Sequence, residues 1–244
     1  MDRTGLKRYA FLTVLFAVPL ISLAVVFMVA GQIAGKPNPK VGKDNKKMNG
    51  FTREDLTRRA AKFGNPILEA LKKPETTVEQ LPTEYFTNGG IFKVSTQPPD
   101  RPRVYFLGVW GSDGIELLNN EPEHFFAVAL HGGLSLRSGT DQVAYVTTFL
   151  DVTRDFTGGV QVLNSIEDSW WLPSPTPDEA RKRDDLLAKY SKIVVAPHLS
   201  DSTVVVYLIR DRVLIRMNAK VENDGRIKVT EDKLETEMPT VMLR

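Results

Sequence analysis

The sequence predicts a β-rich α+β fold class, with a single N-terminal transmembrane helix followed by a mostly antiparallel sheet or sandwich domain that carries two or three helices. Three observations lead to this prediction. Residues 9–35 form a run of 27 residues without a charge. Beyond Ile91, short runs rich in Val, Ile, Phe, Tyr and Thr alternate with glycine, proline and asparagine, which is the pattern of strands and turns. Helix-capping patterns lie near Thr52 and Thr176.

Residues 9–34 are predicted to be the transmembrane helix, after a basic tail at residues 1–8. About 20 apolar residues cross a hydrocarbon core of about 30 Å, and the uncharged run is longer than that. A cleaved secretory signal is the alternative, since small residues at 29–31 would suit a peptidase. Signal cores are only about 7 to 15 residues long, so the sequence favours an anchor that contacts membrane lipid through residues 9–34.

The orientation in the membrane is nearly tied under the positive-inside rule. Arg3, Lys7 and Arg8 precede the uncharged run, and five lysines follow it within residues 35–50. Because the preceding tail is short and Lys7 and Arg8 adjoin the run, the pattern is that of an uncleaved export signal. We favour a single-pass protein of a bacterial-type inner membrane, with the main domain outside the cytoplasm rather than inside it.

Residues 35–50 are predicted to be a flexible basic tether, because they combine five lysines with two prolines and three glycines. These lysines either stay solvated or lie on anionic lipid headgroups. The globular β-rich domain is assigned to residues 51–244, and it starts with a helical lead-in at residues 51–73.

Within the lead-in, Thr52 and Asp55 have the spacing of a capping box. Gly64 is expected to end the first helix. Asn65 is expected to cap a second helix that has Pro66 at its first position.

Nine strands and one further helix are predicted after the lead-in. The helix begins at Thr176, followed by Pro177 and the capping acid Glu179. The last hairpin turns at residues 223–225, where Asn-Asp-Gly favours positive φ angles, and residues 210–212 form another reversal. The predicted strands are residues 91–95, 103–110, 125–131, 142–150, 160–163, 192–196, 203–209, 213–221 and 226–230.

Composition narrows the function classes. The chain has 32 basic and 30 acidic residues, and much of the basic excess surrounds the uncharged run, so no nucleic-acid partner is predicted. It has no cysteine, which excludes disulfides, thiolate metal sites and cysteine nucleophiles.

Catalytic, cofactor-binding and metal-binding motifs are not predicted. In an extended strand, His124 and His131 would point to opposite faces and would not share a metal ion. The glycines after His131 resemble an oxyanion loop, but a nucleophile elbow needs a second glycine where Arg137 follows Ser135. No glycine-rich phosphate loop occurs, and no cofactor is predicted.

The three tryptophans are the candidate contact residues for a partner: Trp170, Trp171 and Trp110. Two consecutive side chains in an extended segment point to opposite sides, so Trp170 and Trp171 cannot both enter the core. Tryptophan is enriched at binding hot spots and at membrane interfaces. The alternative is that the second ring covers the sheet edge beside the helix that starts at Thr176.

These observations favour a non-enzymatic single-span membrane subunit that acts as a scaffold, assembly or accessory component of a larger membrane protein complex. Its expected partners are membrane lipid and other subunits of that complex, through protein–protein interaction. Two alternatives stay open: a membrane-tethered hydrolase, and a module that binds a ligand or lipid.

Overall fold

The structure is a computed structural model that describes residues 50–97, 103–154 and 159–241. These residues belong to one contact unit, Asn45–Arg244. The described helices are α2 (Arg53–Ala60), α3 (Asn65–Lys72), α4 (Pro122–His131), α5 (Gly139–Val152) and α6 (Pro177–Tyr190), with 3₁₀ turns η1 (Ala61–Phe63) and η2 (Ile166–Asp168). The described strands are β1 (Thr77–Gln80), β2 (Gly89–Thr96), β3 (Arg103–Trp110), β4 (Gly114–Leu117), β5 (Val160–Leu163), β6 (His198–Ser200), β7 (Thr203–Arg210), β8 (Val213–Val221) and β9 (Ile227–Glu235).

The predicted tail, the predicted transmembrane helix at 9–34 and nearly all of the predicted tether lie outside the described residues. Among the residues that are described, no helix has the length and apolar character needed to cross a bilayer.

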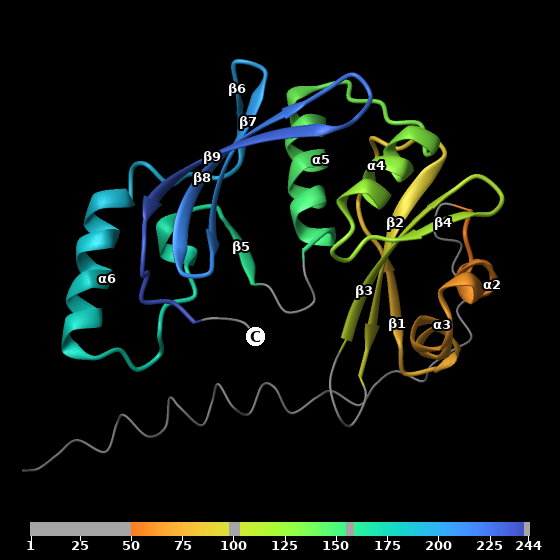
Figure 1. Cartoon of the computed structure of the whole chain (residues 1–244), viewed down its shortest axis with the longest axis horizontal. Helices are drawn as coiled ribbons and strands as arrows, with labels where there is room; N and C mark the ends of the chain where they lie inside the picture. The colour runs from red at the N-terminus through yellow and green to blue at the C-terminus, as the bar shows by residue number, and fades with distance from the viewer. Residues whose placement is uncertain (1–49, 98–102, 155–158, 242–244) are drawn as a thin grey trace, which may run out of the picture. The chain divides into compact units, whose positions relative to one another are not determined.

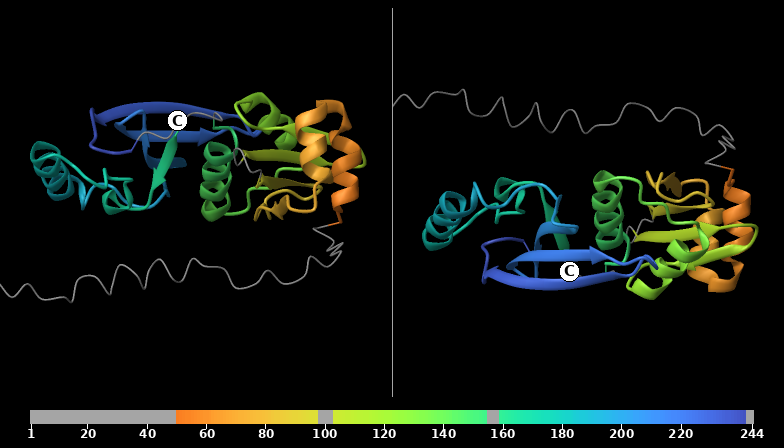
Figure 2. Two further views of the ribbon diagram at one scale, coloured as in Figure 1. Left: turned by 90° about the horizontal axis from the view of Figure 1, so that it is seen from below. Right: turned by 90° about the horizontal axis from the view of Figure 1, so that it is seen from above.

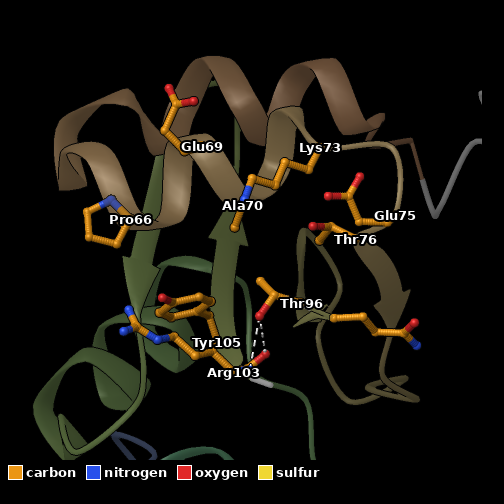
Figure 3. A pocket seen from close by; sticks show the side chains of 10 residues that line it. Pro66, Glu69, Ala70, Lys73, Glu75, Thr76, Thr96, Arg103 and Tyr105 are labelled. Carbon is orange, nitrogen blue, oxygen red and sulfur yellow. Dashed lines mark hydrogen bonds between the residues drawn. The ribbon is translucent and has the colours of Figure 1, made fainter. Parts of the chain in front are cut away.

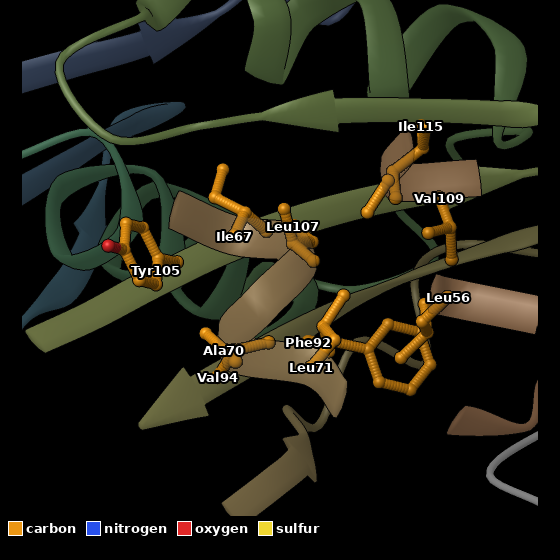
Figure 4. Close-up of a cluster of buried hydrophobic side chains, with 11 residues drawn as sticks. Leu56, Ile67, Ala70, Leu71, Phe92, Val94, Tyr105, Leu107, Val109 and Ile115 are labelled. Atoms are coloured by element: carbon orange, nitrogen blue, oxygen red, sulfur yellow. The ribbon is translucent and has the colours of Figure 1, made fainter. Parts of the chain in front are cut away.

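The first sheet has the strand order β1-β2-β3-β4, and every pairing is antiparallel. Helices α2 and α3 pack on one of its faces (Figure 2). Over the start of β3, next to Tyr105, α3 leaves a cavity (Figure 3). The rest of this face is a continuous apolar core (Figure 4), whose buried members include Leu56, Ile67, Leu71, Phe92, Val94, Leu107, Val109 and Ile115.

Helices α4 and α5 cover the opposite face of the first sheet, where Ile91 and Phe106 meet Phe125 and Tyr145. The close approach of α4 depends on Gly108 in β3. A Cβ at that position would lie 2.3 Å from Val128 Cγ2, so any larger residue would push α4 away from the sheet.

The second sheet has the order β5-β7-β8-β9. The short strand β6 also pairs with β7, next to β5. The central strand of this sheet, β7, is apolar on both faces. Val204, Val206 and Leu208 pack toward α5, whereas the alternate residues belong to the core under α6: Val205, Tyr207 and Ile209. Because both faces of β7 are covered, its sequence is a continuous run of apolar residues.

Helix α5 is shared by the two sheets and lies between them (Figures 1 and 2). Val146 packs on the second sheet, and Tyr145 on the adjacent helix position packs on the first-sheet core. The Tyr145 hydroxyl also donates a 2.7 Å hydrogen bond to the carbonyl of Gly225 in the β8–β9 turn. The layers therefore run α2/α3, first sheet, α4/α5, second sheet, α6.

The α+β class with antiparallel sheets is confirmed, and so are several predicted boundaries. The Thr52–Asp55 capping box forms, as does the Thr176–Glu179 box with Pro177 in the first turn of α6. Both predicted reversals occur, with Gly225 at φ +84° in one. In the other, two residues between β7 and β8 have positive φ: Asp211 and Arg212.

The number and placement of helices differ from the prediction, because the structure has five α-helices among its described residues rather than two or three. Residues 125–131 and 142–150, predicted as strands, are the helices α4 and α5. In α4, Phe125, Val128 and Ala129 follow the i, i+3, i+4 spacing of a helix. In α5, the capping box of Ser138 and Asp141 sets the first turn.

Smaller differences concern residue 64 and four short segments. Gly64, with φ +78°, is the N-cap of α3 in place of Asn65. Residues 192–196 do not form a strand, and Val195 makes an isolated bridge with Ser165. Strands β1, β4 and β6 were not predicted, since each has only three or four residues.

Candidate functional site

The Trp170–Trp171 pair follows η2 and is fixed through its backbone. The Trp170 N–H donates to Gln161 Oε1 at 3.0 Å, and its carbonyl accepts from the Val241 N–H at 2.7 Å. Trp171 forms an isolated bridge with Thr240. The segment is therefore held between β5 and the last described residues.

The two tryptophan side chains lie in different environments. Trp171 is half-buried and packs against the core under α6. Trp170 is 41% exposed. The expectation that the two rings cannot both be buried is confirmed, and the exposed ring is the first of the pair.

Trp170 lines a groove of about 490 Å³ beside α5, which we call the α5 groove. Its walls come from four separate segments: residues 81–82 after β1, the end of α5 with Arg154 just beyond it, β5, and Trp170 after η2. The apolar lining consists of Leu81, Pro82, Leu150, Val160, Val162 and Trp170, and the polar lining of Thr147, Thr148, Asp151, Arg154 and Gln161.

The polar groups of the α5 groove are mostly engaged. Arg154 pairs with Asp151 at 3.5 Å, and its guanidinium lies 5.8 Å from the centre of the Phe106 ring. Gln161 is buried, and besides accepting from Trp170 it donates to the Asp168 carbonyl at 2.6 Å. The Thr147 hydroxyl donates to the Val143 carbonyl within α5 at 2.9 Å. What the groove offers a ligand is therefore mainly apolar surface.

The strand β5 forms one wall and is also an edge of the second sheet. Among the described strands it pairs with β7 alone. Edge strands can accept a further strand from another chain through their outer backbone groups. Three consecutive residues of β5 line the α5 groove, namely Val160, Gln161 and Val162, so an added strand there would meet the apolar walls.

Two buried tyrosines, Tyr85 and Tyr145 of α5, lie in the core between α5 and the first sheet. Burial raises the pKa of the Tyr85 hydroxyl and of the Tyr145 hydroxyl far above the ordinary tyrosine value. Both groups are therefore neutral at any physiological pH. Neither group acts as an acid or a base, and the Tyr145 hydroxyl serves as a structural donor to the Gly225 carbonyl.

Trp110, the third predicted contact residue, lies away from the α5 groove. It is half-buried at the end of β3, where it stacks on His131 with ring centres 5.4 Å apart. On its other side it leaves no room for a side chain at Gly114. The Trp110 carbonyl accepts a 3.1 Å hydrogen bond from Arg59, which also binds the carbonyls of the β3–β4 turn.

The reason given for separating His124 and His131 was wrong, because both lie on helix α4, where residues seven apart share a face. His124 Nδ1 lies 2.8 Å from the Leu117 carbonyl and 3.6 Å from Glu116. Within residues 50–97, 103–154 and 159–241, no group of three or more His, Asp or Glu side chains is placed to hold a metal ion.

Sequence reasoning identified Trp170 but missed the other walls of the α5 groove. Those walls are brought together by α5, a segment that had been predicted as a strand. The Ser138–Asp141 capping box was the signal that would have placed α5 correctly.

Comparison of the chain with known protein families, with curated proteins and with solved structures gives no match.

Proposed function

We propose that this chain is a non-enzymatic, single-span membrane subunit that holds another subunit of a larger membrane complex as a scaffold, assembly or accessory component. The observation that carries the proposal is the exposed Trp170 ring on the wall of the α5 groove. Large aromatic side chains in apolar depressions are the usual anchors of protein–protein interfaces.

The proposed occupant of the α5 groove is an extended apolar segment of the partner subunit. Its backbone adds to the outer edge of β5, which pairs only with β7 among the described strands, and its side chains lie against Trp170, Leu150 and Pro82. Since the lining is mostly aliphatic and Arg154 is already paired with Asp151, an uncharged segment fits better than a charged one.

The membrane part of the proposal rests on the sequence. The uncharged run at residues 9–35 is long enough to span a bilayer, and the basic residues on both sides suit interfaces with anionic lipid. In this proposal the chain makes a single pass through a bacterial-type inner membrane, and residues 51–244 meet their partner outside the cytoplasm.

The test is a native pull-down of the full chain in mild detergent, with the retained subunits measured by mass spectrometry. The tag belongs at the N-terminus, because Val241 hydrogen-bonds to Trp170 and a C-terminal tag would disturb the site. We expect Trp170→Ala to weaken binding of the partner about thirtyfold, which corresponds to a hot-spot loss of about 2 kcal/mol. The melting temperature should change by no more than about 2 °C, since the ring is largely exposed.

Two controls make the result specific. Trp171→Ala removes a ring packed on the core under α6, so it should lower the melting temperature more than Trp170→Ala does. Trp110 lies outside the α5 groove, so Trp110→Ala should leave retention of the partner unchanged. Undiminished retention by Trp170→Ala, or hydrolysis of a generic ester or phosphate by the purified protein, would overturn the proposal.

A further inference from the structure

A cavity of about 350 Å³ lies between α3, the end of β2 and the start of β3, on the first sheet and apart from the α5 groove (Figure 3). Its apolar part is formed by Tyr105, Ala70 and Pro66. Tyr105 and Ala70 are buried members of the first-sheet core, so this part of the wall is held rigidly. The volume is at the lower end of the range of small-molecule sites.

Thr76 contributes a hydroxyl to this cavity that the fold does not use. The residue is only 3% exposed, and its Oγ1 has no hydrogen-bond partner among the described residues. Figure 3 shows the hydroxyl directed toward the space between α3 and the strands. Burial of a hydroxyl without a hydrogen-bond partner costs free energy, because the group loses its bonds to water. A ligand that hydrogen-bonds to this hydroxyl removes that cost, which favours binding.

The charged residues at the rim favour an anion. Glu69 is paired with Lys72 at 3.0 Å, on the outer side of α3. That pairing leaves two cationic residues in the lining, Lys73 and Arg103, against one carboxylate, Glu75. The excess is positive, and the Lys73 side chain extends over the cavity in Figure 3.

We propose that this cavity binds a small organic carboxylate with an apolar body. The carboxylate lies at the rim between Lys73 and Arg103, and the apolar body contacts Tyr105 and Ala70. A polar atom of the ligand hydrogen-bonds to the Thr76 hydroxyl. This site is independent of the proposed partner-binding function.

The first test compares three probes that share one ring: benzoate, benzyl alcohol and benzylamine. Each is titrated into the full chain in detergent micelles, and backbone amide shifts are followed by NMR. We expect benzoate to cause saturable shifts in residues 66–76 and 103–105, with at least tenfold weaker binding of benzylamine. Equal shifts with all three probes, or no saturable benzoate shift up to about 10 mM, would overturn the proposal.

The second test uses Thr76→Val, which keeps the shape of the side chain and removes the hydroxyl. Because the hydroxyl has no partner to lose, the melting temperature should stay the same or rise by about 2–4 °C. Benzoate affinity should fall at least fivefold, the loss of about one hydrogen bond. A clear fall in melting temperature would show that the hydroxyl serves the fold, and the proposal would fail.

Lys73→Gln tests the charge at the rim, with Lys62→Gln as the matched control. Lys62 pairs with Glu116 and does not line the cavity. Both variants change the net charge equally, so only Lys73→Gln should weaken benzoate binding. Equal weakening by the two variants would mean that binding follows overall charge and would count against a built site.

Discussion

The two sheets differ in how completely helices cover them. The first sheet has α2 and α3 on one face and α4 and α5 on the other. The second sheet has α5 on one face, but α6 covers the opposite face only in part. On that face of β8, Leu214 is buried, whereas Arg216 and Lys220 further along the strand are exposed.

This difference separates the part of the domain that supplies stability from the part that offers surface. Strands covered on both faces carry uninterrupted apolar runs, as in β7, and they leave nothing for a partner to contact. Where helix cover ends, the second sheet presents polar side chains on β8 and β9. Its edge strand β5 pairs only with β7 among the described strands. Trp170 lies at that edge, which is why its ring is exposed.

The largest expected effect is on the doubly covered sheet. Phe92 is fully buried between the first sheet and α2, where its ring meets Phe51 edge-on at 5.9 Å. Phe92→Ala should lower the free energy of unfolding by about 3–5 kcal/mol, because it leaves a cavity that the rigid surroundings cannot fill. Urea denaturation of the full chain measures this loss.

Arg216→Ala on the uncovered part of β8 is the counterpart of that change. It should alter the free energy of unfolding by less than about 0.5 kcal/mol, as exposed substitutions usually do. If Arg216→Ala proved as destabilising as Phe92→Ala, the contrast between the two sheets would not hold.

An intermediate effect is expected where α5 ties the two sheets together. Tyr145→Phe removes the hydrogen bond to the Gly225 carbonyl and leaves that acceptor unsatisfied at the buried glycine of an otherwise exposed turn. We expect a loss of about 1–3 kcal/mol, measured by thermal and urea unfolding.

Tyr85→Phe is the matched control for Tyr145→Phe. The Tyr85 hydroxyl lies close to Thr148 but makes no hydrogen bond of acceptable geometry within the described residues. Its removal should therefore cost much less. Equal losses of unfolding free energy from the two variants would show that the hydrogen bond from Tyr145 to Gly225 does not stabilise the fold.

Sequence reasoning succeeded where the signal was local. The capping boxes at Thr52 and Thr176 and the turn at Gly225 depend on a few neighbouring residues, and all were found. The strands β2, β3, β7 and β8 were found because their composition and their bounding turns agree.

The errors arose where tertiary packing outweighs local preference. Helix α5 is rich in β-branched and aromatic residues, since two sheets contact it from opposite sides and both contacts demand apolar side chains. That composition resembles a strand. The α5 groove and the cavity at Thr76 could not be predicted either, because each is assembled from segments far apart in the sequence.

The smallest expected effect concerns α6, which gives the second sheet its partial cover. The pKa of Glu179 is lowered, first by the backbone N–H of Thr176, then by the Thr176 hydroxyl, with a further contribution from Arg212. Since the folded state favours the charged carboxylate, this stabilisation is present above the unfolded pKa of about 4.3. It is lost as the pH falls from that value through the lowered folded pKa.

Glu179→Gln should therefore lower the melting temperature at pH 7 by only about 1–2 °C, because the group is exposed and screened by salt. The difference from the unmodified chain should shrink as the pH approaches 3. Asp55→Asn in α2 is the matched change on the first sheet. The backbone N–H and hydroxyl of Thr52 lower the pKa of Asp55, so its pH dependence has the same sign. A difference that grows as the pH falls would mean that the Glu179 carboxylate destabilises α6, which would contradict the prediction.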